Sequence, residues 1–234
     1  MPVYIPEGEA AWFPPCAAAS PEGVLAVGGD LSLPRLLAAY RQGIFPWYGE
    51  DTPIIWWNLP ERSVLFPESL HIPRSLRRVI NARQFHITLD TAFSDVIHNC
   101  AHSTTRNENG TWIVPEMQVA YTALHHAGYA HSVEAWEEGR LVGGLYGLAL
   151  GKAFFGESMF YRHAGASKVA LVWLVRYLQA RNFSLLDCQQ ETPNTNRFGA
   201  RVIPRTIFMC HLKDALSYPD HTGTWMMPPE FFPL

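Results

Sequence analysis

The sequence predicts an α+β protein, with a small loop-rich N-terminal domain at residues 1–61 and a larger domain at residues 62–234. Residues 1 to about 60 are rich in Pro, Gly and Trp and hold one clear helix, which is typical of loops around a small core. From Arg62 onward, period-two hydrophobic runs are interspersed with helical patterns, and three such runs follow one another before the next helix. Strand, strand, strand, helix, strand is the order expected of an α+β fold.

The N-terminal domain holds a helix that begins after Ser32. Ser32 is placed to cap this helix, and Pro34 suits its first turn, where a missing N–H costs nothing. The apolar stripe of the helix and the glycine that ends it are Leu36, Leu37, Tyr40 and Gly43. The rest of this domain predicts loops.

The larger domain predicts a series of short elements. We expect a strand at 62–66, a helix near 73–82, a strand at 84–89, and a helix after Asp90 with Phe93, Val96, Ile97 and Cys100 facing inward. A polar loop at 103–112 delivers Trp112, and Pro115 opens a helix that ends at Gly128. Strands at 131–136, 141–150 and 152–160, a helix near 166–180 and a strand at 183–189 follow.

Composition excludes several classes of protein. The 234 residues are 48% hydrophobic and 17% charged, which predicts a folded globular chain rather than a disordered or fibrous one. The first ten residues lack the basic start and apolar stretch of a secretory signal, and no apolar run is long enough to span a membrane. Scattered cysteines at 16, 100, 188 and 210 suit reduced thiols. We therefore expect a cytoplasmic protein with no membrane partner.

An arginine cluster stands out against the formal net charge of -3. Arg74, Arg77 and Arg78 lie at i, i+3 and i+4 of a predicted helix and share one face, with Arg83 just beyond. Such a face favours local contact with phosphate, although a merely solvated helix face is equally consistent with the pattern.

Two acidic residues lie in strand-like, apolar settings. Glu157 interrupts the run Phe154-Phe155-Gly156-Glu157-Ser158-Met159-Phe160, and Asp187 lies in Leu185-Leu186-Asp187-Cys188-Gln189. A carboxylate among apolar side chains loses hydration and is retained with a cation, hydrogen-bond donors or a catalytic role. Period-two alternation places Asp187 and Gln189 on one face of their strand, with Leu186 and Cys188 on the other. A satisfied structural pair remains open for Asp187 and Gln189, as does a carboxylate bound by backbone amides for Glu157.

Together, several segments resemble the leucyl/phenylalanyl-tRNA–protein transferases in order along nearly the whole chain. They are Gly28-Gly29-Asp30-Leu31-Ser32, Gly43-Ile44-Phe45-Pro46-Trp47, Trp56-Trp57, Gly110-Thr111-Trp112-Ile113, His131-Ser132-Val133-Glu134, Gly156-Glu157-Ser158-Met159-Phe160 and the Asp187 strand. The resemblance implies an enzyme that moves leucine or phenylalanine from charged tRNA onto the amino terminus of proteins that begin with Lys or Arg. It also implies an acetyltransferase-like (GNAT) C-terminal domain whose central mixed sheet has splayed strands.

The same resemblance assigns roles to individual residues. Trp47 and Trp112 match the tryptophans that stack on the terminal adenine of the donor, and Glu157 matches an acid that orients an amine. The candidates for the pocket that holds the amino-acid side chain are Leu145, Phe154, Leu174, Leu178 and Leu186. Asp187 and Gln189 are our candidates for accepting the proton of the attacking amine. We expect no cofactor and a monomer, and the preference among leucine, phenylalanine and methionine stays open.

Rival functions are also open. Arg162-His163-Ala164-Gly165-Ala166-Ser167 approaches the pyrophosphate loop of acyl-coenzyme A N-acyltransferases, but Ser167 departs from that pattern. A non-catalytic tRNA-binding module and a Cys188 nucleophile are further alternatives; Cys188 faces away from Asp187 and Gln189 and has no histidine placed to activate it. His125, His126 and His131 lack acidic or thiol partners at a recognisable metal-ligand spacing.

Overall fold

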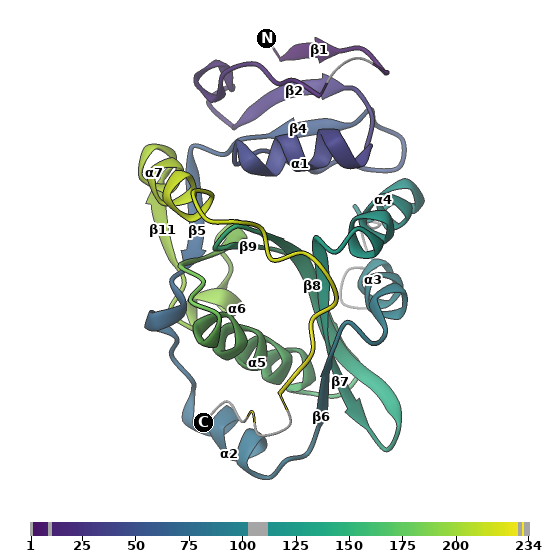
Figure 1. The fold of residues 1–234 in the computed structure, drawn as a ribbon, viewed down its shortest axis with the longest axis vertical. Coiled ribbons are helices and arrows are strands. Elements are labelled where there is room, and N and C mark those ends of the chain that lie inside the picture. Colours follow the sequence, from purple (N-terminus) through teal and green to yellow (C-terminus); the bar gives the residue numbers. More distant parts are fainter. Residues whose placement is uncertain (1, 9–10, 103–111, 229–230, 232–234) are drawn as a thin grey trace.

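Two sheets form the framework of the chain (Figure 1). The structure, a computed structural model, describes residues 2–8, 11–102, 112–228 and 231. Near the N-terminus, a four-stranded sheet has the order β1-β2-β4-β3, and it covers helix α1. The rest of the chain forms a seven-stranded sheet of order β11-β5-β10-β9-β8-β7-β6 with helices on both faces. The predicted α+β class is confirmed.

The N-terminal sheet was not predicted from the sequence, because its strands are only two to five residues long and carry little periodicity. They are β1 (Val3–Ile5), β2 (Val24–Gly28), β3 (Phe45–Pro46) and β4 (Ile55–Trp57). The predicted helix is present as α1 (Leu33–Arg41), and a 3₁₀ turn lies at Cys16–Ala18. Ser32 occupies the cap position of α1, but its side chain makes no capping hydrogen bond among the described residues. The backbone N–H of Ser32 donates instead to Asp30 Oδ1 at 2.9 Å.

The seven-stranded sheet is mixed. Its strands are β5 (Glu61–Leu65), β6 (His86–Leu89), β7 (Ala130–Glu137), β8 (Arg140–Leu150), β9 (Ala153–Tyr161), β10 (Leu185–Gln189) and β11 (Arg201–Pro204). β9 and β10 are parallel because helix α5 connects them, whereas the other described neighbours pair antiparallel. The strands predicted at 62–66, 84–89, 131–136, 141–150, 152–160 and 183–189 are all present within two residues at either end.

Helices divide the interior into two cores. They are α2 (Arg74–Asn81), α3 (Phe93–Ala101), α4 (Pro115–His126), α5 (Ala166–Ala180), α6 (Pro193–Asn196) and α7 (Arg205–Ala215), with a 3₁₀ turn at Pro67–Ser69. One core joins α1, α3, α4 and the N-terminal sheet to one face of the large sheet, and the other joins α2 and α5 to the opposite face. Phe154 and Phe155 are both fully buried, one in each core, as alternation along β9 requires.

The sheet opens where β9 and β10 part. Their parallel pairing runs from Ala153 opposite Leu185 to Phe155 opposite Asp187 and ends there. Both strands carry a β-bulge at this level. In β9, the extra residue is Glu157, which lies between the residue that pairs with Gly147 and the residue that pairs with Tyr146. In β10, the extra residue is Cys188. Bulges re-aim side chains and end strand pairing. The divergence matches the splayed strands that the family resemblance implies.

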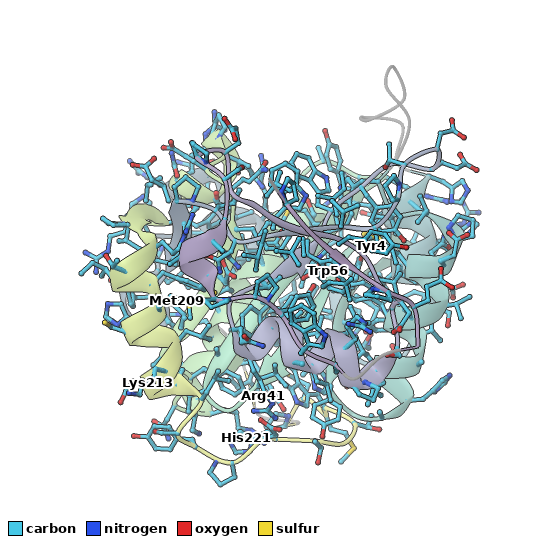
Figure 2. The ribbon with its side chains drawn as sticks, turned by 90° about the horizontal axis from the view of Figure 1, so that it is seen from above. Tyr4, Arg41, Trp56, Met209, Lys213 and His221 are labelled. Atoms are coloured by element: carbon cyan, nitrogen blue, oxygen red, sulfur yellow. The ribbon has the colours of Figure 1, made fainter. Side chains whose placement is uncertain are left out.

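The C-terminal segment after α7 crosses the molecule and is tied down along its way. Arg41 Nη2, at the end of α1, pairs with Asp220 at 2.5 Å, and Figure 2 shows Arg41 close to His221 in the same segment. Further along, the Trp225 N–H donates to Asp90 Oδ2 at 2.7 Å, and the indole stacks on His131 with ring centroids 3.8 Å apart. Asp90 was expected just before a helix, but α3 is capped by Ala92, and Asp90 instead binds this tail.

The predicted polar loop lies outside the described residues at 103–111; Trp112 is described. Among the helices that the structure describes, none has the length and apolar character that crossing a bilayer requires.

Candidate active site

A cavity of about 290 Å³ opens where β9 and β10 diverge. Its walls come from β8, β9, α5, β10 and the α6 region. Its lining combines apolar side chains with the acid and hydroxyl groups of Glu157, Ser158, Thr192 and Thr195. The lining residues are Leu145, Tyr146, Gly156, Glu157, Ser158, Met159, Leu171, Leu174, Leu186, Cys188, Thr192, Asn194 and Thr195. An apolar hollow with a few polar groups is the usual form of a small-ligand site.

Glu157 is held by three side chains that come from distant parts of the chain. Its Oε1 accepts from the Tyr40 hydroxyl at 2.7 Å and from Gln189 Nε2 at 3.0 Å, and its Oε2 accepts from the Tyr121 hydroxyl at 3.1 Å. The two tyrosine hydroxyls also contact each other at 2.5 Å. Helices α1 and α4 therefore fix the carboxylate that the β9 bulge turns toward the cavity.

Counting protons in this triangle shows which ionisation state it favours. Three contacts join Glu157, Tyr40 and Tyr121, but the two phenols together supply two protons when the carboxylate is ionised. A proton on Glu157 provides the third and satisfies all three contacts. Burial raises the pKa of Glu157 from 4.5 to about 7; the tyrosine hydrogen bonds oppose this rise, and the nearby charge of Asp187 adds to it. The carboxyl group thus titrates near neutral pH.

We expect this pKa to make the folding stability pH-dependent. Glu157 binds its proton more tightly in the folded chain than in the unfolded chain, so the free energy of unfolding falls as pH rises from 4.5 to about 7. Glu157→Gln removes the titration. Across this window the native protein should lose on the order of 3 kcal/mol relative to Glu157→Gln. Urea unfolding of both proteins at pH 5 and pH 8 measures the change, and parallel pH profiles would contradict it.

Asp187 lies beside this network but does not line the cavity. It is fully buried, and Arg62 holds it: Arg62 Nε lies 2.9 and 3.1 Å from the two carboxylate oxygens, and Nη2 lies 2.7 Å from Oδ2. Oδ1 also accepts from the backbone N–H of Gln189 at 2.8 Å. The structure therefore joins Asp187, Gln189 and Glu157 in one connected set, with Gln189 as the link.

The alternation expected for the Asp187 strand agrees with the structure, although the strand is bulged. Leu186 and Cys188 line the cavity, whereas Asp187 and Gln189 are not among its lining residues and instead bind Arg62 and Glu157. Burial and the charge of Asp187 raise the pKa of Cys188, so its thiol is a poor nucleophile.

The five residues expected to line the pocket divide into two groups. Leu145, Leu174 and Leu186 line the cavity. Phe154 and Leu178 are fully buried in the core on the α5 face and are not among its lining residues. The structure adds Leu171, one helical turn before Leu174 on α5, and Met159 on β9. Periodicity did not single out these two, because on sequence grounds each is simply a core residue.

Of the two predicted stacking tryptophans, Trp47 lies beside the N-terminal sheet and Trp112 shortly precedes α4. Trp47 follows β3, is 37% exposed, and lies against Trp57 with ring centroids 5.6 Å apart. Burial raises the pKa of the neighbouring Tyr48 to about 12, and the negative charge of Glu116 in α4 adds to this rise. Trp112 is half-buried and packs on the core three residues before α4.

The arginines of α2 are on the outside of the molecule. Arg74, Arg77 and Arg78 are exposed, while Leu76 and Ile80 of the same helix are buried. Arg83 is also exposed and follows the helix with φ of 51°. A single-signed cationic face is therefore presented to solvent.

The rival sites find little support. Arg162 Nη2 donates to Asn99 at 2.5 Å, and the carboxylate of Glu137 lies 2.6 Å from His163 Nδ1, which places a negative charge beside the suggested pyrophosphate loop. In the part of the chain that the structure describes, no cluster of three or more His, Cys, Asp or Glu residues is suited to a metal ion.

Besides Leu171 and Met159, three polar residues around the site were not predicted from the sequence: Tyr40, Tyr121 and Arg62. Tyr40 and Tyr121 fit the apolar stripes of their helices, so nothing marked their hydroxyls as functional. Arg62 carried a usable signal, because an arginine that enters a short apolar strand needs a buried anion as partner.

Comparisons with known proteins agree along the chain. A family model described as leucyl/phenylalanyl-tRNA protein transferase matches residues 64–213, and a model of that family's N-terminal domain matches residues 29–59. A protein from Nitratidesulfovibrio vulgaris (strain DP4) named leucyl/phenylalanyl-tRNA–protein transferase is 53% identical over 233 residues, covering 100% of both chains. One of the same name from Oleidesulfovibrio alaskensis is 55% identical over 227 residues, covering 95% of this chain and 92% of the other.

Among solved structures, a ribosomal-protein-alanine N-acetyltransferase from Brucella melitensis biovar Abortus 2308 aligns with 19% identity and a TM-score of 0.34, covering 48% of this chain and 85% of that one. This similarity is too low to bear on the function.

Proposed function

Because the chain belongs to the leucyl/phenylalanyl-tRNA protein transferase family, we propose that it moves leucine or phenylalanine from aminoacyl-tRNA onto the α-amino group of proteins that begin with Lys or Arg. The protein is an aminoacyltransferase. The acceptor class, and the role of the product as a mark for degradation, are parts of the proposal.

The reaction exchanges one acyl bond for another. The acceptor nitrogen attacks the carbonyl carbon of the aminoacyl ester, a C–N bond forms, the C–O bond to the ribose breaks, and the proton lost by the amine ends on the ribose oxygen. An ester is already activated, so the enzyme mainly holds the two reactants in place. An α-amino group has a pKa of roughly 7.7–8.0, so at neutral pH it must also lose a proton before it attacks.

The observation that best supports this function is that Glu157 lines an apolar cavity and is bonded by Gln189 Nε2 at 3.0 Å. An ionised Glu157 attracts a cationic amine, and Gln189, whose amide nitrogen donates to Glu157, has its amide oxygen left to accept from the attacking amine. We propose that Gln189 receives the amine, that Glu157 orients it, and that Asp187 fixes the position of Gln189. Since ionised Glu157 is required, transfer should rise with pH through about 7.

The side chain of the donor fits the apolar part of the cavity. Leu145, Leu171, Leu174 and Leu186 surround it with aliphatic groups, which suit leucine or phenylalanine. Such a wall discriminates by size at only about 1–3 kcal/mol per methylene, so methionine is a reasonable further donor. Trp47 and Trp112 would stack on the terminal adenine, where each ring contributes about 1–3 kcal/mol per base.

The proposal also covers the oligomeric state and the cellular compartment of the protein. The monomeric state is likewise part of the proposal. The four cysteines are free and apart from one another, which suits the cytoplasm.

Charge reversal on α2 tests whether this helix contacts tRNA. Arg74→Glu with Arg78→Glu should weaken full-length charged tRNA about 10-fold and flatten the dependence of log K on log salt by about 1 to 2. The rate of transfer from a short aminoacyl-adenosine donor should stay at the native level. Reversal of the exposed Arg140 and Lys213 is the matched control. Equal losses on both donors would show that α2 matters for the fold rather than for tRNA.

One assay decides the class of reaction. The purified protein is offered labelled Phe-tRNA, and separately labelled acetyl-coenzyme A, together with a protein that begins with Arg and a matched one that begins with Ala. Label should pass from Phe-tRNA alone, and onto the Arg protein alone. Transfer from acetyl-coenzyme A, or none from Phe-tRNA, would overturn the proposal, and equal labelling of both acceptors would overturn the acceptor class.

A further inference from the structure

Arg62 is buried at the junction of the two sheets, and its whole guanidinium is occupied. The side chain is 1% exposed. Nε and Nη2 bind both oxygens of Asp187, and Nη1 donates to the carbonyl of Gly43 at 2.9 Å. The group also lies between two aromatic rings, 4.8 Å from the centroid of Phe45 and 4.5 Å from that of Phe208. Contacts with these four residues leave the guanidinium little freedom to move.

The partner of Arg62 is equally constrained. Each oxygen of Asp187 faces the guanidinium, and Oδ1 also accepts from the Gln189 N–H. In this bidentate pair both carboxylate oxygens already accept hydrogen bonds from a cationic guanidinium. Asp187 does not line the cavity. It is therefore an anion held in place rather than a group free to collect the proton of the amine.

The bond from Asp187 to the Gln189 backbone has a conformational consequence. Gln189 has φ of 61°, the left-handed region that residues other than glycine seldom adopt. It also follows the β10 bulge. Such a conformation persists when surrounding contacts impose it. Here the Asp187 Oδ1 bond does so, and the turned backbone brings Gln189 Nε2 to Glu157 at 3.0 Å.

We infer that Arg62 is a positioning residue for the transfer reaction: by clamping Asp187 it imposes the backbone turn at Gln189 and thereby places the amide that receives the attacking amine. This inference rests on the proposed function. It removes Asp187 from the path of the proton and gives it, together with Arg62, the task of aiming Gln189. Since Arg62 also binds Gly43, the clamp reaches from β10 to the loop after α1, the helix that supplies Tyr40.

Arg62→Lys tests the inference, because lysine keeps the charge but cannot form the bidentate pair. A misplaced reacting group costs up to about 100-fold in rate. We expect kcat with a Phe-adenosine donor to fall between about 10-fold and about 100-fold, with KM within about threefold of native. The rise of kcat near pH 7 should remain, because Glu157 is intact. Arg35→Lys, at a buried arginine that pairs with Asp30 and not with Asp187, is the control and should keep native kcat.

A second pair of variants excludes a merely structural role. Asp187→Asn should lower kcat about as much as Arg62→Lys, and the double variant should be no slower than the slower single one, because both act through the same contact. Arg62→Met with Asp187→Asn removes both charges and leaves no unpaired ion. Thermal unfolding identifies which variants are folded at the assay temperature.

The outcomes separate the hypotheses. Native kcat in folded Arg62→Lys, or in folded Arg62→Met with Asp187→Asn, would overturn the positioning role. Multiplied losses in the Arg62→Lys with Asp187→Asn variant would also overturn it, since they would assign Asp187 a step of its own. If native protein transfers no phenylalanine, the proposed function fails, whatever these variants do.

Discussion

Replacing Gln189 with alanine is expected to lower kcat for transfer about 100-fold, the usual contribution of a positioned group that accepts a proton or a hydrogen bond in the transition state. The affinity for charged tRNA should stay within about threefold of native, because we propose that the cavity and the tryptophans, rather than Gln189, hold the donor. Single-turnover transfer from Phe-tRNA measures the first quantity, and filter binding at matched salt measures the second.

The backbone at Gln189 requires a second variant, because alanine at φ of 61° is strained. Gln189→Gly removes the amide and suits this conformation, so it should be as slow as Gln189→Ala if the side chain matters. Gln190→Ala, at the exposed neighbour, is the matched control. Near-native kcat in Gln189→Gly would mean that the amide takes no part in transfer.

The largest expected effect on stability is that of Gly147→Ala. Gly147 faces Gly156 at the β9 bulge, and an added Cβ would lie 2.1 Å from the carbonyl oxygen of Phe155 and 2.5 Å from the ring of Phe154. Backbone oxygen cannot move aside without opening the sheet. We expect a loss of about 3 kcal/mol or more in the free energy of unfolding. Because this bulge presents Glu157, the pKa of Glu157 should also change in any folded fraction.

Gly156→Ala is the control for this substitution. Gly156 is the partner of Gly147 across the same bulge, but its added Cβ would meet Asp187 O at 3.5 Å, an ordinary contact. Urea unfolding should show Gly156→Ala much closer to native than Gly147→Ala. Similar stabilities for the two variants would show that the bulge tolerates a side chain at either position.

Local periodicity determined most of the regular elements. The helix at 166–180 and the strands on either side were predictable because long apolar patterns repeat at 3.6 or 2 residues. The N-terminal strands escaped prediction, since two to five residues hold no measurable period. The bulges escaped as well: Phe155 and Phe160 are an odd number of positions apart, yet both lie in the same core, because Glu157 adds one residue to β9.

The candidate site was predicted in part. Glu157, Asp187 and Gln189 were marked by the cost of polar groups in apolar strands, and the structure connects all three. Leu145, Leu174 and Leu186 line the cavity, but Phe154 and Leu178 do not. Sequence patterns give no distance across a fold, so apolar residues beside a pocket and those behind it look the same.

The sequence by itself determined the α+β class, the order of the long elements and the presence of costly acids in two apolar strands, because these follow from local periodicity and from the price of dehydrating charge. Only the tertiary structure decided the partners of those acids. Arg62 binds Asp187, which is 125 positions away in the sequence, and Tyr40 binds Glu157, which is 117 positions away. Contacts between residues so far apart depend on how the two sheets and their helices pack, which no local pattern encodes.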